Sequence, residues 1–367
     1  MTLLFVSTSG KCLGLARRCA TEGYKVNLHI ENECCLSVGE GIVDKLSPYR
    51  RLLNRGGECI VTTANRLFDE VKPDLIIFEG NGMGKVADYA RDENYSVFGN
   101  SYWSDCLSNR SGYADNILHR IGIEKWKGED GVRVEVGMWW NGLRSLSPFI
   151  IFNEGRFMND SLGPNINSAG NAIKMAEGKM IDESIQKIEC LLKKTRFRGI
   201  ISLSLVITKS KILAVSFTTS LLYLPSLLEI YKGSVSDLLL STAESRKPEG
   251  KFTTDYALSI FLSIPPFPAV TASSPNIPLK GVSPSNLKHL YLMDVCRNGS
   301  GYESAGANGS LMWVSARGRT VGEAKKRVYK TISNISIPDI QYRTDIISEN
   351  EVTKKEKKLV DWNFLSL

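Results

Sequence analysis

The sequence is poor in the residues that build disulfide frameworks and metal centres. Its 367 residues include 8 cysteines and 3 histidines, and no two cysteines form a C-x-x-C pair. The histidines, His29, His119 and His289, are far apart and outside any ligand-like spacing. Structural zinc sites need clusters of these two residue types, and disulfide scaffolds need far denser cysteine. We therefore expect no such metal centre, and the unpaired cysteines fit the reducing cytoplasm.

Long apolar runs are also missing. No window approaches the roughly 18 apolar residues that a membrane-spanning helix needs. The short apolar run at residues 3–6 has no basic segment before it, which favours a first β-strand over a signal peptide. The sequence therefore predicts a protein that does not act at a membrane.

Charge of one sign is only mildly in excess. Lys and Arg total 46 and Asp and Glu total 39, which gives a formal net charge of +7. Part of the surplus is local, because a lysine-rich run, Lys354–Lys358, lies near the C-terminus. Such a run is usually a solvated end, and contact with nucleic acid is the alternative. Hydrophobic residues make up 43 %, an ordinary globular share, and the length suggests two or three domains at about 150 residues each.

The N-terminal part alternates between strand and helix patterns. Apolar runs predict strands at 3–6, 25–30, 74–78 and 95–98, and amphipathic stretches predict helices at 12–22, 84–91 and 104–121. Strands separated by helices indicate an open parallel sheet covered on both faces. We expect an α/β domain over residues 1–122.

The pattern changes after Gly122. Strands are predicted at 132–140, 148–152, 255–264, 290–295 and 311–316, with a hairpin of 198–208 and 211–219. Helices are predicted at 183–192 and 321–332, and the Pro- and Ser-rich segment 265–284 is expected to be a loop. This is an α+β pattern with antiparallel strands. We expect domains at 123–250 and 251–348, followed by a charged tail at 349–367.

Two turns that follow predicted parallel strands are candidates for binding phosphate. Ser9, Gly10 and Lys11 follow the first strand and open a helix, where backbone N–H groups attract anions. Glu79 and Gly80 begin a glycine-rich turn after a buried strand, and ligands of open α/β sheets bind at this edge. Neither turn matches a known nucleotide-binding loop. An ordinary strand-to-helix connection is the alternative for the first turn, and the second is the stronger signal.

The most specific segment runs from Asn153 to Gly170 and reads NEGRFMNDSLGPNINSAG. It resembles the "GPNTGGMG" loop, with its preceding basic residue, of the phosphoribosylamine–glycine ligases, which are ATP-grasp enzymes. Further segments resemble the family's "VFGP", "YRG", "ALG-T-EEA" and "QYRRDIG" motifs in the same order: Val97-Phe98-Gly99, Phe197-Arg198-Gly199, Ala316–Ala324 and Gln341–Ile346. The resemblance covers most of the chain and is strongest to divergent relatives in bacterial viruses.

The resemblance implies a fold and a reaction. The fold is a Rossmann-like pre-ATP-grasp domain, an α+β ATP-grasp-like domain and a small C-terminal domain. The family joins glycine to the amine of phosphoribosylamine through an acyl phosphate made from ATP. Carried over to this sequence, the residues that would bind substrate are Gly163, Pro164, Asn165, Ser168, Gly170, Arg156 and Arg198. A tight turn for the glycine-rich part and exposed salt bridges for the arginines are the alternatives.

This sequence departs from the family where ATP is handled. Only Glu124–Gly131 stands where the family has a whole lid subdomain, and so short a segment cannot fold into one. The lysines of the family's nucleotide helix and the polar residues of its metal-binding strand are replaced by Ser111, Asp115, Ser216, Thr218 and Ser220. Neutral hydroxyls are poor ligands for Mg²⁺. The sequence therefore predicts a reduced or absent lid and no ordinary ATP-grasp turnover.

Three functions remain open. The first is a degenerate ligase-like protein, with unknown catalytic residues and no assigned cofactor, that binds a small molecule or acts as a subunit, either of a homo-oligomer or of a heteromer with an active paralogue. The second is an active ATP-dependent carboxylate–amine ligase with ATP and Mg²⁺ as cofactors. The third is a nucleic-acid-associated role in modifying viral DNA bases, for which the lysine-rich run and the net charge of +7 are the physical support.

Overall fold

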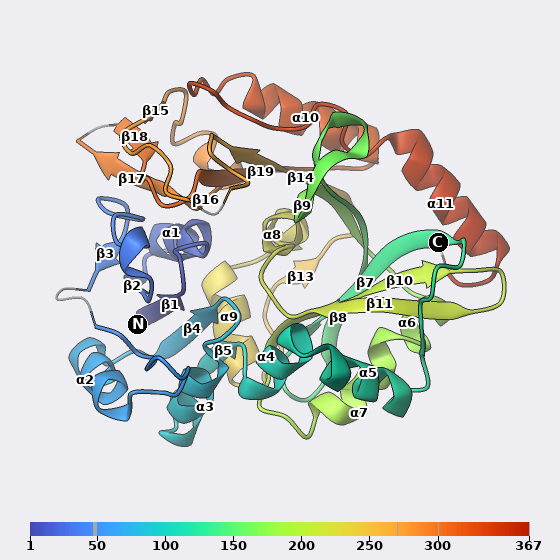
Figure 1. Ribbon diagram of the computed structural model, residues 1–367, viewed down its shortest axis with the longest axis horizontal. Helices are drawn as coiled ribbons and strands as arrows, with labels where there is room; N and C mark the ends of the chain where they lie inside the picture. Colours follow the sequence, from blue (N-terminus) through green and yellow to red (C-terminus); the bar gives the residue numbers. More distant parts are fainter. Residues whose placement is uncertain (47–49, 270, 300, 367) are drawn as a thin grey trace.

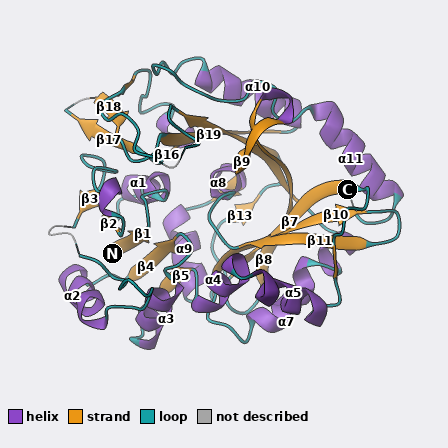
Figure 2. Cartoon of the chain, in the orientation of Figure 1, coloured by secondary structure: helices purple, strands orange, loops and turns teal. Residues whose placement is uncertain are grey.

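The computed structural model describes residues 1–46, 50–269, 271–299 and 301–366. Val270, in the predicted loop 265–284, and Leu367, at the end of the predicted tail, lie outside the described residues. Two large sheets carry the fold, a five-stranded one at the N-terminus and a nine-stranded one, with helices around both (Figure 1; Figure 2). Among the described helices, none is long and apolar enough to cross a membrane.

The N-terminal sheet is parallel, with the strand order β3-β2-β1-β4-β5. Residues alternate across its central strand: Leu3 and Phe5 share a core with the first helix, and Leu4 and Val6 share one with the next two. Helices therefore cover both faces, which confirms the predicted open α/β sheet. The elements are β1 (Thr2–Ser7), α1 (Leu13–Thr21), β2 (Lys25–Ile30), η1 (Glu33–Cys35), β3 (Asp44–Lys45), α2 (Val61–Val71), β4 (Leu75–Glu79), α3 (Gly84–Asp92) and β5 (Val97–Gly99).

The single helix predicted at 104–121 is wrong, because two helices replace it. α4 (Tyr102–Asn109) ends before Arg110, whose backbone is extended at φ −124° and ψ 100°, and α5 (Ser111–Arg120) follows directly. Ser111 and Gly112 are weak helix formers, so the break falls where helix propensity is lowest. Ser101 and Ser104 form a capping box at the start of α4.

The second sheet has the order β16-β19-β14-β9-β8-β7-β10-β11-β6 and is antiparallel apart from the short β6–β11 pair. The β10–β11 hairpin turns at Lys209-Ser210 as predicted, whereas β8 is much longer than the predicted strand 148–152. The strands are β6 (Glu124–Lys125), β7 (Val132–Trp140), β8 (Ser145–Met158), β9 (Leu162–Met175), β10 (Gly199–Ile207), β11 (Ile212–Thr218), β14 (Tyr256–Ser263), β16 (Leu290–Leu292) and β19 (Ser310–Gly318).

Shorter elements connect these strands. The predicted helix at 183–192 is wrong in part, because buried Ser184 leaves the helical region at φ −123° and ψ −92° while its hydroxyl donates to the Met180 carbonyl. The predicted helix at 321–332 is confirmed as α10 (Val321–Ile332). The connecting elements are η2 (Asn159–Ser161), α6 (Lys179–Asp182), η3 (Ile185–Ile188), α7 (Glu189–Leu192), α8 (Leu224–Ile230), β12 (Tyr231–Lys232), α9 (Val235–Ala243), β13 (Lys251–Phe252), β15 (Pro278–Leu279), η4 (Leu287–His289), β17 (Val295–Asn298) and β18 (Gly301–Ser304).

The charged C-terminal segment is a packed helix, α11 (Glu349–Asp361), so the expectation of a solvated end is wrong for one of its faces. Val352, Glu356 and Leu359 are buried. The Glu356 carboxylate pairs with Lys174 of β9 at 2.9 Å and accepts a hydrogen bond from the Tyr256 hydroxyl at 2.7 Å. In the sequence, lysines stand between these buried residues, so the apolar pattern of an amphipathic helix is not apparent.

One backbone hydrogen bond joins the two sheets. The Gly99 N–H, at the end of β5, donates to the carbonyl of Arg198, just before β10, at 2.7 Å. Gly99 has a φ of +115°, and a Cβ there would lie 2.2 Å from the Phe78 carbonyl oxygen. Only glycine fits this position, since any side chain would push the strands apart.

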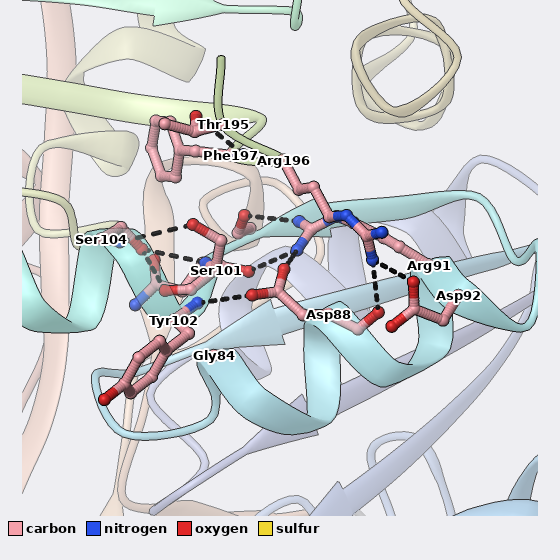
Figure 3. Close-up of polar contacts among 12 residues, drawn as sticks. Gly84, Asp88, Arg91, Asp92, Ser101, Tyr102, Ser104, Thr195, Arg196 and Phe197 are labelled. Carbon is pink, nitrogen blue, oxygen red and sulfur yellow. Dashed lines mark hydrogen bonds and ion pairs between the residues drawn. The ribbon is translucent and has the colours of Figure 1, made fainter. Parts of the chain in front are cut away.

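Charged side chains lie close to this joint, and Figure 3 shows four of them, Asp88, Arg91, Asp92 and Arg196, with their polar contacts. The buried Arg91 guanidinium donates to the carbonyls of Gly99 and Asn100 and to the Asp88 carboxylate, each at 2.9 Å. Arg196, which belongs to the segment leading into β10, pairs with Asp92 and donates to the Asp88 carbonyl. The joint therefore combines a buried network with an exposed ion pair.

Replacing Arg91 by Met is expected to lower the free energy of unfolding by about 3 kcal/mol, because two carbonyls and a carboxylate lose their donor. Urea denaturation followed by circular dichroism measures the change. Arg196→Ala is the matched control, and removal of its exposed pair is expected to cost less than about 1 kcal/mol. Equal effects of the two variants would contradict this view of the joint.

Candidate functional site

A cavity of about 870 Å³ lies where the two sheets meet, lined from the N-terminal sheet, the β8–β9 hairpin, β7 and β11. Predicted site residues from distant parts of the sequence come together there. Those that line it are Lys11, Glu79, Gly80, Asn165 and Ser168. Those that do not are Ser9, Gly10, Arg156, Gly163, Pro164, Gly170 and Arg198.

The first predicted phosphate turn is closed on itself. The Ser7 hydroxyl donates to Glu79 Oε2 at 2.5 Å and accepts from the N–H groups of Gly10 at 2.8 Å and Ser9 at 3.3 Å. These two backbone donors are therefore already used. Burial raises the pKa of Glu79, and the Ser7 hydroxyl and the Lys11 charge oppose this rise. Lys11 is the residue of this turn that reaches the cavity.

The second turn is held by a residue that sequence reasoning missed. The buried Asp105 carboxylate, from α4, accepts from the N–H groups of Gly82 at 3.0 Å and Gly84 at 2.7 Å. The Asn100 amide donates to Asn81 Oδ1 at 3.1 Å. The sequence did offer a signal for this role. Asp105 is an acid in the first turn of a helix that follows the glycine-rich turn, and the N–H groups of such a turn attract a carboxylate. Asp105 is thus a positioning residue for this wall.

The β8–β9 hairpin carries the family-like segment and is only partly at the cavity. Asn165 and Ser168 line it, whereas the Gly163 carbonyl lies further out and accepts from the Arg156 guanidinium at 2.8 Å. Asn165 Oδ1 accepts from the Asn167 N–H at 2.9 Å, which closes a tight turn. The outer part of the segment therefore shapes the hairpin.

Arg343 anchors this hairpin from the "QYRRDIG"-like segment. Its buried guanidinium forms two hydrogen bonds of 2.8 Å with Asp345 and lies 3.4 Å from Glu154 Oε2. The hydrogen bonds from Arg343 hold the pKa of Asp345 below its usual value. Asp345 in turn accepts from the Asp160 N–H at 2.7 Å, at the hairpin's turn. The motif thus positions Glu154 at the cavity edge.

Two predicted substrate residues have packing roles instead. Arg198 Nε donates to the Ser245 hydroxyl at 3.2 Å, away from Arg156, so the two arginines do not form one anion site. Gly170 lies inside β9, and a Cβ there would be 2.3 Å from Ile346 Cδ1. Close packing against the C-terminal segment explains this glycine.

Glu135 on β7 is the second residue that the sequence did not reveal. Its carboxylate is buried at the cavity wall, where Oε1 accepts from the Tyr223 hydroxyl at 2.7 Å and from Asn153 Nδ2 at 3.1 Å. Burial raises the pKa of Glu135, and these neutral donors only partly oppose the rise. Among the described residues, no basic side chain forms an ion pair with it.

Comparisons with known proteins agree on the fold. The chain is 23 % identical over 250 residues to the phosphoribosylamine–glycine ligase of Streptomyces coelicolor, covering 64 % of this chain and 59 % of that protein. It is similar in structure to the phosphoribosylamine–glycine ligase of Thermotoga maritima, with a TM-score of 0.71 and 13 % identity. The match covers 95 % of this chain and 100 % of the Thermotoga chain. No protein-family model matches.

Two further solved structures are similar. The phosphoribosylglycinamide synthetase of Anaerococcus prevotii gives a TM-score of 0.60 at 11 % identity, covering 92 % of this chain and 98 % of that one. The urea carboxylase of Kluyveromyces lactis gives a TM-score of 0.64 at 13 % identity, and the match covers 92 % of this chain and 30 % of the carboxylase. The chain has the ATP-grasp fold of the phosphoribosylamine–glycine ligases. The match to the Streptomyces ligase spans 59 % of that ligase's length.

The strand that resembles the ligases' metal-binding strand forms another cavity wall. At the positions that differ from the ligases it presents the hydroxyls of Ser216, Thr218 and Ser220, and neighbouring residues such as Val215, Phe217 and Thr219 line the cavity as well. Within the described part of the chain, no group of three or more His, Cys, Asp or Glu side chains could hold a metal ion. This donor set does not fit Mg²⁺, which prefers carboxylate and phosphate oxygens.

The segment that resembles the ligases' nucleotide helix does not place its differing residues at the cavity. Asp115, where a lysine was expected from the resemblance, forms an exposed ion pair of 2.8 Å with Lys125. Neither Asp115 nor Ser111 lines the cavity. Residues 121–131 are all described, and β6 is their one regular element.

Replacing Glu135 by Gln is expected to change how stability depends on pH. Because the folded-state pKa of Glu135 is raised above 4.5, its contribution is fully present at lower pH and is lost as the pH rises through that pKa. Gln mimics the protonated form, so the variant should gain stability relative to the wild type as the pH rises. Urea unfolding at a series of pH values measures this, and parallel curves for the two proteins would contradict it.

Proposed function

We propose that this chain is a degenerate relative of the phosphoribosylamine–glycine ligases that binds a small molecule in its cavity without ordinary ATP-grasp turnover. The observation that carries the proposal is residues 121–131, which contain β6 and no lid between α5 and β7. A lid excludes water and closes over the phosphates during phosphoryl transfer. Without one, an acyl phosphate would be exposed to hydrolysis.

The charge on the cavity wall supports the same proposal. Phosphoryl transfer needs a metal ion or several cations fixed around the transferred group. The hydroxyls of Ser216, Thr218 and Ser220 supply neither. A catalytic carboxylate cluster is therefore not available on β11, and binding is the activity that the wall favours. Assembly into a homo-oligomer, or into a heteromer with an active paralogue, stays a prediction.

An active carboxylate–amine ligase, joining glycine or another amino acid to an amine in a purine-like pathway or on viral DNA bases, is the second candidate. Lys11, Arg133 and Lys355 line the cavity and favour it, because they could offset the charge of nucleotide phosphates. This candidate needs ATP and Mg²⁺, and a partner chain would have to complete the site.

Incubating the purified chain with ATP, Mg²⁺, glycine and phosphoribosylamine is expected to release no phosphate above background, with the Streptomyces ligase as positive control. Millimolar Mg-ATP is also expected to leave the melting temperature unchanged, whereas a ligand at 100 times its dissociation constant would add about 2.7 kcal/mol of stability. Robust phosphate release would overturn the proposal in favour of the active ligase.

The nucleic-acid proposal rests on α11, where Lys354, Lys357 and Lys358 are exposed. Changing all three to Gln is expected to weaken binding to duplex DNA and to lower the salt slope by about 0.9 for each phosphate that is no longer neutralised. Exposed Lys193 and Lys194, changed to Gln, provide the control. Fluorescence anisotropy at several salt concentrations measures both, and an identical slope for wild type and triple variant would remove this proposal.

A further inference from the structure

One wall of the cavity has more hydrogen-bond acceptors than donors. Ser168 is only 2 % exposed, and its hydroxyl has no hydrogen-bond partner among the described residues. Asn153 Oδ1 is also buried without a partner there. Both residues line the cavity beside Glu135. Buried polar atoms are normally satisfied, so the Asn153 oxygen points to a missing donor and the Ser168 hydroxyl, which can accept or donate, to a missing partner.

The orientation of the Asn153 amide is fixed by its neighbours. Its Nδ2 donates to Glu135 Oε1 at 3.1 Å and to the Asn167 carbonyl at 2.8 Å. Both partners are acceptors, so exchanging the nitrogen and oxygen would break both hydrogen bonds. Oδ1 is therefore an acceptor that faces no protein donor. Glu135 and Asn153 are thus in direct contact, and Ser168, the residue after Asn167 in β9, lines the same cavity.

The same patch holds a carboxylate without a counter-ion. The groups that hydrogen-bond to Glu135 Oε1, Tyr223 and Asn153, are neutral. Arg133 lies two residues away on β7, but its guanidinium stacks on the Trp126 ring at 4.5 Å. A buried carboxylate is costly unless a cation pairs with it. A cation from outside the chain would remove this cost.

We propose that Glu135, Asn153 and Ser168 form a binding site for the protonated primary amine of the molecule that occupies the cavity. An ammonium group has three N–H donors and one positive charge, which match a carboxylate and two neutral acceptors. An amine held in this way has no free lone pair, so the site recognises the ligand and does not activate it as a nucleophile. The inference rests on the proposed small-molecule binding and names its chemical class.

Three phenylalkyl probes of different charge test the inference, and the amine and the alcohol among them match in size. They are 2-phenylethylamine, 2-phenylethanol and 3-phenylpropionate, whose rings suit the Phe261, Phe267 and Trp313 side chains that also line the cavity. Titration at pH 7, followed by ligand-observed NMR, is expected to show the amine binding at least about tenfold more tightly than the alcohol, as one charge-assisted contact predicts.

Variants locate the preference. Glu135→Gln keeps the shape of the side chain, and the ratio of amine to alcohol affinity should fall to about one. Ser168→Ala should weaken amine binding roughly fivefold, as the loss of one hydrogen bond predicts. Glu356→Gln is the matched control, since Glu356 is another buried carboxylate but lies outside the cavity lining, and the ratio should not change. Circular dichroism and melting temperatures establish that each variant is folded.

Three results would overturn the inference: no preference for the amine in the wild type, a preference that survives Glu135→Gln, or a preference abolished equally in Glu356→Gln. If all three probes bind with similar affinity, the cavity binds small molecules and the inference alone fails. If none binds while phosphate is released from ATP, the proposed function fails as well.

Discussion

The hydrogen bond from the Gly99 N–H to the Arg198 carbonyl joins the two large sheets, and the cavity lies where these sheets meet. It brings the end of β5 against the start of β10, so the carboxyl ends of the parallel strands face the second sheet. Lys11 and Glu79 then stand across from the hairpin that carries Asn165 and Ser168. This hydrogen bond requires glycine at position 99, because a Cβ there would collide with the neighbouring strand.

The second constraint is the anchoring of the β8–β9 hairpin. A hairpin of this length would not keep its tip in place alone, since an isolated two-stranded ribbon is marginally stable. Arg343 and Asp345 hold it through hydrogen bonds to each other and to the hairpin's backbone. The two family-like motifs, far apart in sequence, therefore act as one unit. Their retention here is explained by architecture and does not require catalysis.

The fold was predictable where periodicity is undisturbed. The parallel strands and α10 show it, because apolar spacing and glycine or proline boundaries agree there. Prediction failed where one residue overrides a longer pattern, as at Arg110 between α4 and α5 and at Ser184 before η3. It failed also at α11, whose buried Leu359 and Val352 are outnumbered by lysines. Each failure reflects packing that short-range spacing does not encode.

The site was predictable only in part, for a related reason. Along β7 the valines at 132, 134 and 136 face the core, so Arg133 and Glu135 between them read as solvent-facing. Arg133 is exposed as expected, whereas Glu135 is covered by Tyr223 and the hairpin. Whether a polar position on a sheet meets water or a cavity is decided by elements distant in sequence. The resemblance to family motifs identified Asn165 and Ser168, because a motif match does not require knowing whether a polar side chain meets water or a cavity.

The arrangement of the carboxylates separates binding from phosphoryl transfer. Metal-dependent transfer needs acidic groups that share one ion. Here Glu79 is held by Ser7, Glu154 lies beside Arg343, and Glu135 is held by Tyr223 and Asn153. Drawing them together around a metal would break each of these contacts, two of them buried. Acids held apart in this way can each recognise a single donor or charge, which is what selective binding requires and what a shared metal centre excludes.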